Sequence, residues 1–155
     1  MKFNKNKTYY KVTNKNENHH GLQYHDGLIE DVHPFNNNKN ETCTKGRIYI
    51  TDLEHLPLFF GYGCWIREIT LPKDVKYICE RDKIGVDKVI MGRRYSFDEY
   101  FDKWFDGEKF NWDYSDSLAV HCSEYFDKWF DGEKFNWYYS DSLAVHCSEY
   151  FDKWF

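Results

Sequence analysis

The sequence predicts an α+β N-terminal domain with a small, mostly antiparallel sheet, followed by a short α-helical, solenoid-like repeat array. Three observations predict this fold class: two nearly identical 25-residue segments over residues 100–149, apolar residues at helical spacing inside them, and short β-rich runs in the first part of the chain. The expected N-terminal domain covers residues 1–97, and the expected repeat array covers residues 98–155.

The repeats occupy residues 100–124 and 125–149, and a partial third copy covers residues 150–155. The two complete copies differ only where Asp113 of the first corresponds to Tyr138 of the second. Such identity indicates a recent duplication, so we expect the copies to share one structure and to have diverged little in function.

Each repeat is predicted to form one helix of about 15 residues and a connector of about 10 residues. Ser115 or Asp113 is the expected N-cap, and Gly132 is the expected C-terminal cap. One amphipathic helix cannot bury its apolar stripe alone, so successive units are expected to stack as in a solenoid. In the first helix the stripe contains Leu118, Cys122, Tyr125, Phe126, Trp129 and Phe130.

The expected N-terminal domain contains five strand candidates separated by segments rich in turn residues. Asp52 is expected to cap a short helix over residues 53–60, which Pro57 limits or kinks. Residues 14–45 are rich in Asn, His, Lys and Gly and are expected to form long loops. The strand candidates, rich in β-branched and aromatic residues, are residues 8–13, 47–51, 64–71, 73–79 and 88–91.

Charge is distributed unevenly along the chain. The net charge is −5, but residues 99–155 hold thirteen acidic and five basic residues, a net of −8, which leaves +3 for the first 98 residues. An acidic surface repels phosphate, so nucleic acid is not an expected partner of the repeats. The weakly basic N-terminal half leaves a nucleic-acid-associated factor open as an alternative.

Composition also bears on membranes and redox state. No run of about 18 apolar residues occurs, so no membrane span is expected, and the polar N-terminus lacks the apolar core of a signal peptide. The chain is therefore expected to stay inside a cell. Its five cysteines are odd in number and show no Cys-x-x-Cys spacing, so we expect free thiols.

A histidine-rich stretch is the first candidate for chemistry in the N-terminal domain. Its spacings fit no familiar zinc pattern, so we expect solvated loop residues, no metal and no cofactor. The residues concerned are His19, His20, His25, His33 and Cys43.

A second candidate combines Tyr10, Tyr49 and Glu68, each on an expected strand. The segment 46–50, Gly-Arg-Ile-Tyr-Ile, resembles the Gly-x-Tyr-Phe strand of ADP-ribosyltransferases, whose sites combine a His or Arg, a Tyr and a Glu across neighbouring strands. An enzyme with an ADP-ribosyltransferase-like N-terminal domain is therefore kept as an alternative.

A modest basic patch is the third candidate. It is expected to be solvated surface that pairs with the acidic repeats. It consists of Lys83, Lys88, Arg93 and Arg94.

The aromatic residues of the repeats are expected to form the core between stacked helices, with apolar rings exposed at an uncapped C-terminal end. No catalytic residue is assigned. Because exposed rings favour docking, the candidate binding residues are Trp104, Trp112, Trp129, Trp137, Trp154 and Phe155.

Several segments in order resemble the N-terminal domain of repeat proteins encoded by giant viruses of the mimivirus family, where the domain precedes ankyrin-like or other helical repeats. They are residues 10–14, 23–28, 48–52, 61–69 and 86–90, and the Tyr-Phe-Asp-Lys-Trp-Phe and Phe-Asn-Trp-x-Tyr-Ser pieces resemble repeats of the same virus group.

This resemblance implies a non-catalytic protein-protein interaction protein of a giant virus. The array would be the docking surface and the N-terminal domain its cap. The implied partner is a viral or host protein, with self-association through the uncapped C-terminal repeat. The implied location is the host cytoplasm or viral factory, with the virion as an alternative. The array is shorter than the resemblance implies.

Overall fold

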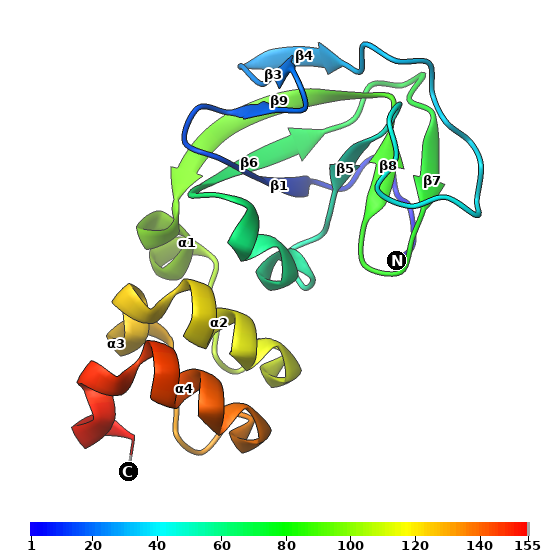
Figure 1. Ribbon diagram of the computed structural model, residues 1–155. Helices are drawn as coiled ribbons and strands as arrows, with labels where there is room; N and C mark the ends of the chain where they lie inside the picture. Colours follow the sequence, from blue (N-terminus) through cyan, green and yellow to red (C-terminus); the bar gives the residue numbers. More distant parts are fainter. Residues whose placement is uncertain (155) are drawn as a thin grey trace.

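The computed structural model of the chain describes residues 1–154 (Figure 1). Antiparallel sheets occupy the N-terminal part, and short helices follow from residue 97 onward. The mixed α and β content that the sequence predicts is therefore confirmed. Among residues 1–154, no helix is long and apolar enough to cross a membrane.

A four-stranded antiparallel sheet forms the centre of the N-terminal part, in the order β1-β6-β9-β4. Tyr9 and Tyr10 are neighbours on β1, so their side chains leave opposite faces of the sheet, and each belongs to a different apolar core. The strands are β1 (Tyr9–Thr13), β6 (Trp65–Thr70), β9 (Lys88–Ser96) and β4 (Gly27–Glu30).

A three-stranded sheet, β5-β8-β7, covers the core on the Tyr9 face. Ile48, Ile84 and Val86 of this sheet are almost fully buried together with Ile69 of β6. Its strands are β5 (Ile48–Ile50), β8 (Ile84–Val86) and β7 (Tyr77–Cys79), and a separate hairpin joins β2 (Asn18–His19) to β3 (Leu22–Gln23).

Two expectations for this part were wrong. The stretch 14–45 is not all loop, because it contains β2, β3 and the edge strand β4. The four residues of β4 alternate too briefly to give a clear periodic signal, since only Ile29 is buried while Leu28 is 54% exposed. The helix expected over 53–60 is instead the 3-10 helix η1 (Leu56–Tyr62), while Asp52 accepts a hydrogen bond from the His55 amide.

The helical part begins at Ser96, which forms a capping box with Glu99 at the start of α1. In Figure 1, η1 lies between the four-stranded sheet and α2, and α2 and α4 lie side by side. The helices are α1 (Phe97–Lys103), η2 (Trp112–Tyr114), α2 (Ser115–His121), η3 (Ser123–Tyr125), α3 (Phe126–Trp129), η4 (Trp137–Tyr139), α4 (Ser140–His146) and η5 (Ser148–Lys153).

The expected 15-residue helix is wrong, because the chain leaves helical geometry at Cys122, with φ −130° and ψ 27°. The Cys122 carbonyl instead accepts a 2.8 Å hydrogen bond from the Trp129 indole. The break turns α3 relative to α2, and Leu118, Cys122 and Trp129 are all buried. The apolar stripe is thus buried by two short helices.

The expected caps also differ. Asn111 accepts a hydrogen bond from the Asp113 amide and starts η2, whereas α2 has no side-chain cap. Ser115 is fully buried between the repeats, and α3, the last helical segment before Gly132, ends at Trp129 with Phe130 as its C-cap. Ser115 thus contacts the next copy instead of capping α2, and Phe130 takes the place expected for Gly132.

One apolar core runs from the Tyr10 face of the sheet through η1 into the helices. Phe60 of η1 lies 4.9 Å from the Phe97 ring, and Tyr10 of β1 lies 5.4 Å from the Trp104 ring, measured between centroids. The domain boundary expected at residues 97 and 98 stays a prediction, and the packing across it is continuous.

Candidate functional site

Ring stacking joins each repeat to the next. Phe126 of the first helical pair lies parallel to Tyr150 with centroids 4.6 Å apart and 1° between planes. The corresponding pair one copy earlier, Phe101 and Tyr125, has centroids 5.3 Å apart and 33° between planes. The junction between consecutive copies therefore repeats the same aromatic contact.

Ion pairs follow the same period along the outside of the array. Lys128 lies 2.8 Å from Asp102, and Lys153 lies 2.6 Å from Asp127, each pair spanning 26 residues. Lys134 pairs with Glu108 over the same spacing. Each exposed pair of this kind contributes little to stability, but the repetition of the pairs matches the register of one copy on the next.

Polar groups inside the junction are also matched between copies. The buried Ser115 hydroxyl accepts from the Asn136 amide at 3.3 Å. The Cys147 thiol donates to the Ala119 carbonyl at 3.6 Å. These contacts satisfy groups of the first copy that stacking removes from water.

One period later, on the second copy and the partial third copy, the corresponding groups lie at the surface. Phe126 is 1% exposed, whereas Phe151 at the same repeat position is 56% exposed. Ser115 and Ala119 are buried, whereas their counterparts are exposed. We call this surface the end face, and it consists of Ser140, Ala144, Phe151 and Asp152.

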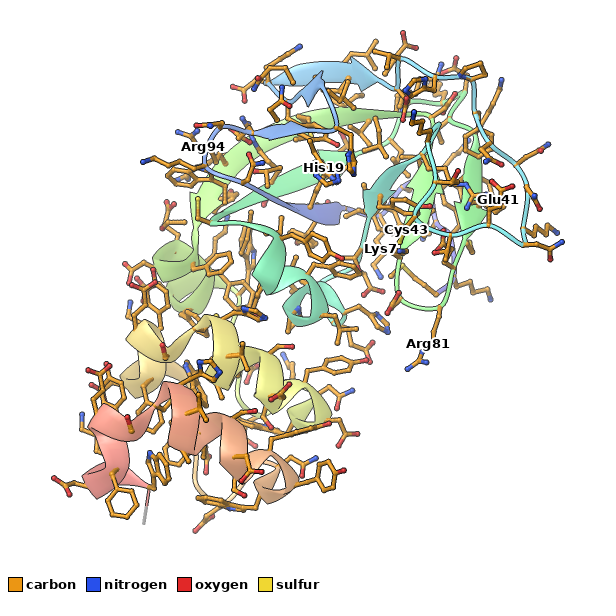
Figure 2. All side chains as sticks on the ribbon, in the orientation of Figure 1. Lys7, His19, Glu41, Cys43, Arg81 and Arg94 are labelled. Atoms are coloured by element: carbon orange, nitrogen blue, oxygen red, sulfur yellow. The ribbon has the colours of Figure 1, made fainter. Side chains whose placement is uncertain are left out.

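A cavity of about 700 Å3 lies in the N-terminal part, apart from the array. Figure 2 labels His19 and Cys43, which reach this cavity from β2 and from the loop after β4. Lys11 of β1, Tyr49 of β5 and Lys83 before β8 also line it. Residues far apart in the sequence thus meet at one hollow.

Lys11 is the half-buried cation of this cavity. Its Nζ donates to the Tyr49 carbonyl at 3.0 Å and lies 5.2 Å from the centre of the Tyr24 ring. Burial, and then the neighbouring charge of Lys83, lowers the pKa of Lys11 to about 8. Among residues 1–154, no carboxylate lies within ion-pair distance of this ammonium.

Cys43 and Lys83 form a second polar pair at the cavity. Lys83 Nζ donates to Cys43 Sγ at 3.0 Å and lies 4.4 Å from the centre of the Tyr49 ring. The hydrogen bond from Lys83, followed by that from Thr42, lowers the pKa of the Cys43 thiol. A thiol of this kind is more nucleophilic at neutral pH than an ordinary one.

The chain is similar to proteins of Acanthamoeba polyphaga mimivirus. An uncharacterised protein of this virus is 34% identical over 102 residues, which make up 63% of this chain and 73% of that protein. The chain belongs to the family of this mimivirus protein. The expected resemblance to proteins of this virus group is therefore confirmed.

Two further relatives of the same virus are named as ankyrin repeat proteins. One is 38% identical over 91 residues, which cover 56% of this chain and 45% of the relative. The other is 33% identical over 95 residues, covering 58% of this chain and 28% of the relative. The chain spans less than half the length of these two relatives. No protein-family model and no solved structure matches the chain.

The tyrosines and the glutamate of the transferase-like constellation do not converge. Tyr10 and Tyr49 both line the cavity, but Glu68 does not. The Glu68 carboxylate instead accepts from the Tyr95 hydroxyl at 3.3 Å and lies 3.9 Å from Lys103 Nζ. Tyr10 is thus paired with Glu68 across β1 and β6 and shares the cavity with Tyr49, but Glu68 does not reach that cavity.

Four of the five members of the histidine-rich stretch line the cavity, and only His25 does not. The prediction that these residues are solvated loop residues thus missed the cavity that four of them line. Within residues 1–154, no three His, Cys, Asp or Glu side chains are grouped so that they could hold a metal ion. All five cysteines are free thiols.

The basic patch pairs mainly inside the N-terminal part rather than with the repeats. Lys83 and Lys88 lie next to Glu80 and Asp74 respectively. Arg94 pairs with Glu17 at 3.2 Å. Arg93 alone reaches the helical part, where it lies 2.6 Å from Glu99 of α1.

The first three candidate binding residues along the chain are half-buried or buried. Trp104 packs against Tyr95 of β9, with centroids 4.5 Å apart, and so joins the array to the sheet. Trp112 is half-buried and donates to the Gly107 carbonyl at 2.9 Å. Trp129 is 2% exposed.

The other candidate binding residues lie nearer the end face. Trp137 is 39% exposed and Trp154 is 8% exposed. Phe155 lies outside the described residues. A docking role for the whole set stays a prediction, while the end face of smaller residues beside Phe151 was not found from sequence. Comparing burial between identical positions of two copies is the signal that reveals it.

Proposed function

We propose that the protein is a non-catalytic protein-protein interaction protein of a giant virus, in which the helical array docks a partner and the N-terminal part caps the other end. The observation that carries this proposal is the difference in burial between Phe126 and Phe151. The same amino acid is 1% exposed in one copy and 56% exposed one period later, so its ring offers surface to a docking protein. Repeat arrays stack in this way and use their surfaces for binding.

The end face fits a partner segment with the chemistry of another helical repeat. Such a segment would place an aromatic ring on Phe151, as Tyr150 lies on Phe126. It would also place a lysine beside Asp152, as Lys153 lies beside Asp127. Ankyrin-type names among the relatives support a partner that is itself a protein.

A different protein fits the end face better than a second copy does. In this chain the opposite side of α2 contacts η1, so the stacking face of the first copy is already occupied. Two copies could meet only end face to end face, which brings Asp152 of one towards the acidic surface of the other. Like charges oppose such contact. Self-association is therefore the second outcome of the test.

The test compares capture by the immobilised full chain with capture by two double variants. Phe151→Ser/Asp152→Lys alters the end face, and Leu28→Ser/Glu30→Lys makes the same chemical change on β4. We expect the wild type and the β4 variant, but not the end-face variant, to capture a protein from virus-infected host cells. That protein, once purified, should bind the purified chain directly.

Light scattering of the same samples distinguishes the outcomes. If the wild type is a dimer and only the end-face variant is a monomer, the occupant of the end face is a second copy of the chain and not a different protein. A monomer whose binding partners are the same for all three proteins would contradict the proposal.

A further inference from the structure

The cavity of the N-terminal part differs in charge from the array. Its lining includes the cations Lys11, Lys45, Arg47 and Lys83, against only two carboxylates. Of those two, Glu17 is neutralised by a bidentate pair with Arg67, both bonds being 2.7 Å long. The cavity therefore carries an excess of positive charge.

One of these cations, Lys11, is incompletely compensated, whereas Lys83 lies 3.6 Å from the Glu80 carboxylate. Arg47 is satisfied, since its guanidinium donates to the loop carbonyls of Asn36, Asn38 and Glu41. Lys11, by contrast, has the Tyr49 carbonyl as its hydrogen-bond acceptor within residues 1–154, and Lys83 is close enough to disfavour its charge. A half-buried ammonium is stabilised when an anion approaches it.

Aromatic rings lie on the same cavity. Tyr24 and Tyr49 line it beneath the two lysines, and Phe59 and Tyr62 of η1 line it from the opposite element. Tyr62 is 65% exposed, and its ring centroid lies 6.1 Å from that of Phe59. Exposed rings of this kind stack planar groups such as nucleobases.

Backbone strain is concentrated at the same place. Within residues 1–154, the non-glycine residues with positive φ are Glu17, His20 and Cys43, at 50°, 50° and 52°. All three line the cavity. Residues other than glycine rarely adopt this backbone conformation. Strained residues that cluster at one cavity are typical of ligand sites.

We propose that this cavity binds a nucleoside monophosphate, with the phosphate at Lys11 and Lys83 and the base against the exposed Tyr62 ring. The volume of about 700 Å3 lies within the range of small-molecule sites. A free phosphate satisfies only the lysines, and a nucleoside satisfies only the rings, so neither uses the whole site. The site is separate from the end face and does not depend on it.

The test is calorimetric titration of the full chain with the four ribonucleoside monophosphates, inorganic phosphate and adenosine. We expect at least one nucleotide to bind with a dissociation constant below about 1 mM. Phosphate and adenosine should each bind at least about tenfold more weakly. If phosphate binds as tightly as the nucleotide, the base makes no contact that contributes to binding. If adenosine binds as tightly as the nucleotide, the phosphate makes none.

Lysine variants localise the site. Lys11→Met and Lys83→Met should each weaken nucleotide binding about tenfold or more, because each keeps the apolar stem and removes the charge. Lys88→Met is the matched control, since Lys88 pairs with Asp74 outside the cavity, and its binding should be unchanged within about twofold. Circular dichroism checks that every variant is folded. Equal weakening by all three variants, or no nucleotide binding by the folded wild type, would overturn the proposal.

Discussion

Phe126 lies flat against Tyr150, the residue that begins the next copy, with 4.6 Å between the two ring centroids. The phenylalanine is 1% exposed because this neighbour covers it, whereas its counterpart Phe151 is 56% exposed. The same amino acid in the same local sequence therefore has two environments. The chain contains its own matched control for the energy of stacking one repeat on another.

Phe126→Ala should lower the free energy of unfolding by about 3–5 kcal/mol, because it opens a cavity in the shared core. Phe151→Ala should lower it by less than about 1 kcal/mol, since the side chain is largely in water. Urea denaturation followed by tryptophan fluorescence measures both. Equal losses for the two variants would show that Phe126 is not stabilised by its neighbouring copy.

Much of the N-terminal fold could be predicted from sequence. The runs at residues 8–13, 47–51 and 64–71 contain β1, β5 and β6, because β-branched and aromatic residues cluster there between turn residues. The strand β8 was missed, since Gly85 interrupts its three residues. That glycine is required by packing, because an added Cβ would lie 2.6 Å from Arg47 Cδ.

The repeat period was evident from sequence, but the helix break at Cys122 was not. Periodicity records which side chains are buried, and Leu118, Cys122 and Phe126 are buried as it predicts. It does not record whether one helix or two short ones bury them. At the break the Cys122 carbonyl accepts from both the Tyr125 amide and the Trp129 indole, and these bonds stabilise two short helices.

The cavity could not be predicted from sequence because its parts are distant along the chain. Lys11, Cys43 and Lys83 come from three separate segments, and each alone resembles an ordinary surface residue. The bridge between Tyr10 and Thr51 and the pairing of β5 with β8 bring Lys11 close to Lys83. Long-range pairing of this kind leaves no local pattern.

Gly63 allows a close approach between the end of η1 and β1. A Cβ at this position would lie 2.0 Å from the Thr13 carbonyl oxygen, the same oxygen that accepts a 3.0 Å hydrogen bond from the Cys64 amide. Gly63→Ala should therefore destabilise the protein by about 1–3 kcal/mol. The control is Gly107→Ala, where the nearest atom would be 3.8 Å away, and it should change stability by less than about 0.5 kcal/mol. Thermal unfolding of both variants by circular dichroism checks this, and equal melting temperatures would contradict it.

Cys43 should react first among the five cysteines with iodoacetamide at neutral pH. The Lys83 hydrogen bond lowers the pKa of its thiol, whereas burial raises that of Cys122 and raises that of Cys147 to about 11. A time course analysed by mass spectrometry of peptides gives the order. Lys83→Met should slow alkylation of Cys43 several-fold and leave that of the exposed Cys79 unchanged. If the alkylation rate of Cys43 does not change in the Lys83→Met variant, Lys83 does not lower the pKa of the Cys43 thiol.

Glu17 should make the protein sensitive to acid. Burial alone would raise the pKa of its carboxyl, but hydrogen bonds from Arg67, Thr13 and Arg94 outweigh burial and lower it. A carboxyl whose pKa falls on folding stabilises the protein above its unfolded value of 4.5, and this stability is lost as the pH drops through the lower, folded pKa.

Glu17→Gln should thus cost about 1–3 kcal/mol at pH 7, because it removes one of the two carboxylates that pair with the buried Arg67 and leaves only Asp26. The difference in free energy of unfolding between the variant and the wild type should narrow steadily as the pH falls below about 4. Urea unfolding at several pH values between about 2.5 and 7 measures it, with the exposed Glu133→Gln expected to follow the wild-type curve throughout. A free-energy difference that stays constant over this pH range would mean that Glu17 stabilises the fold by packing and not by its charge.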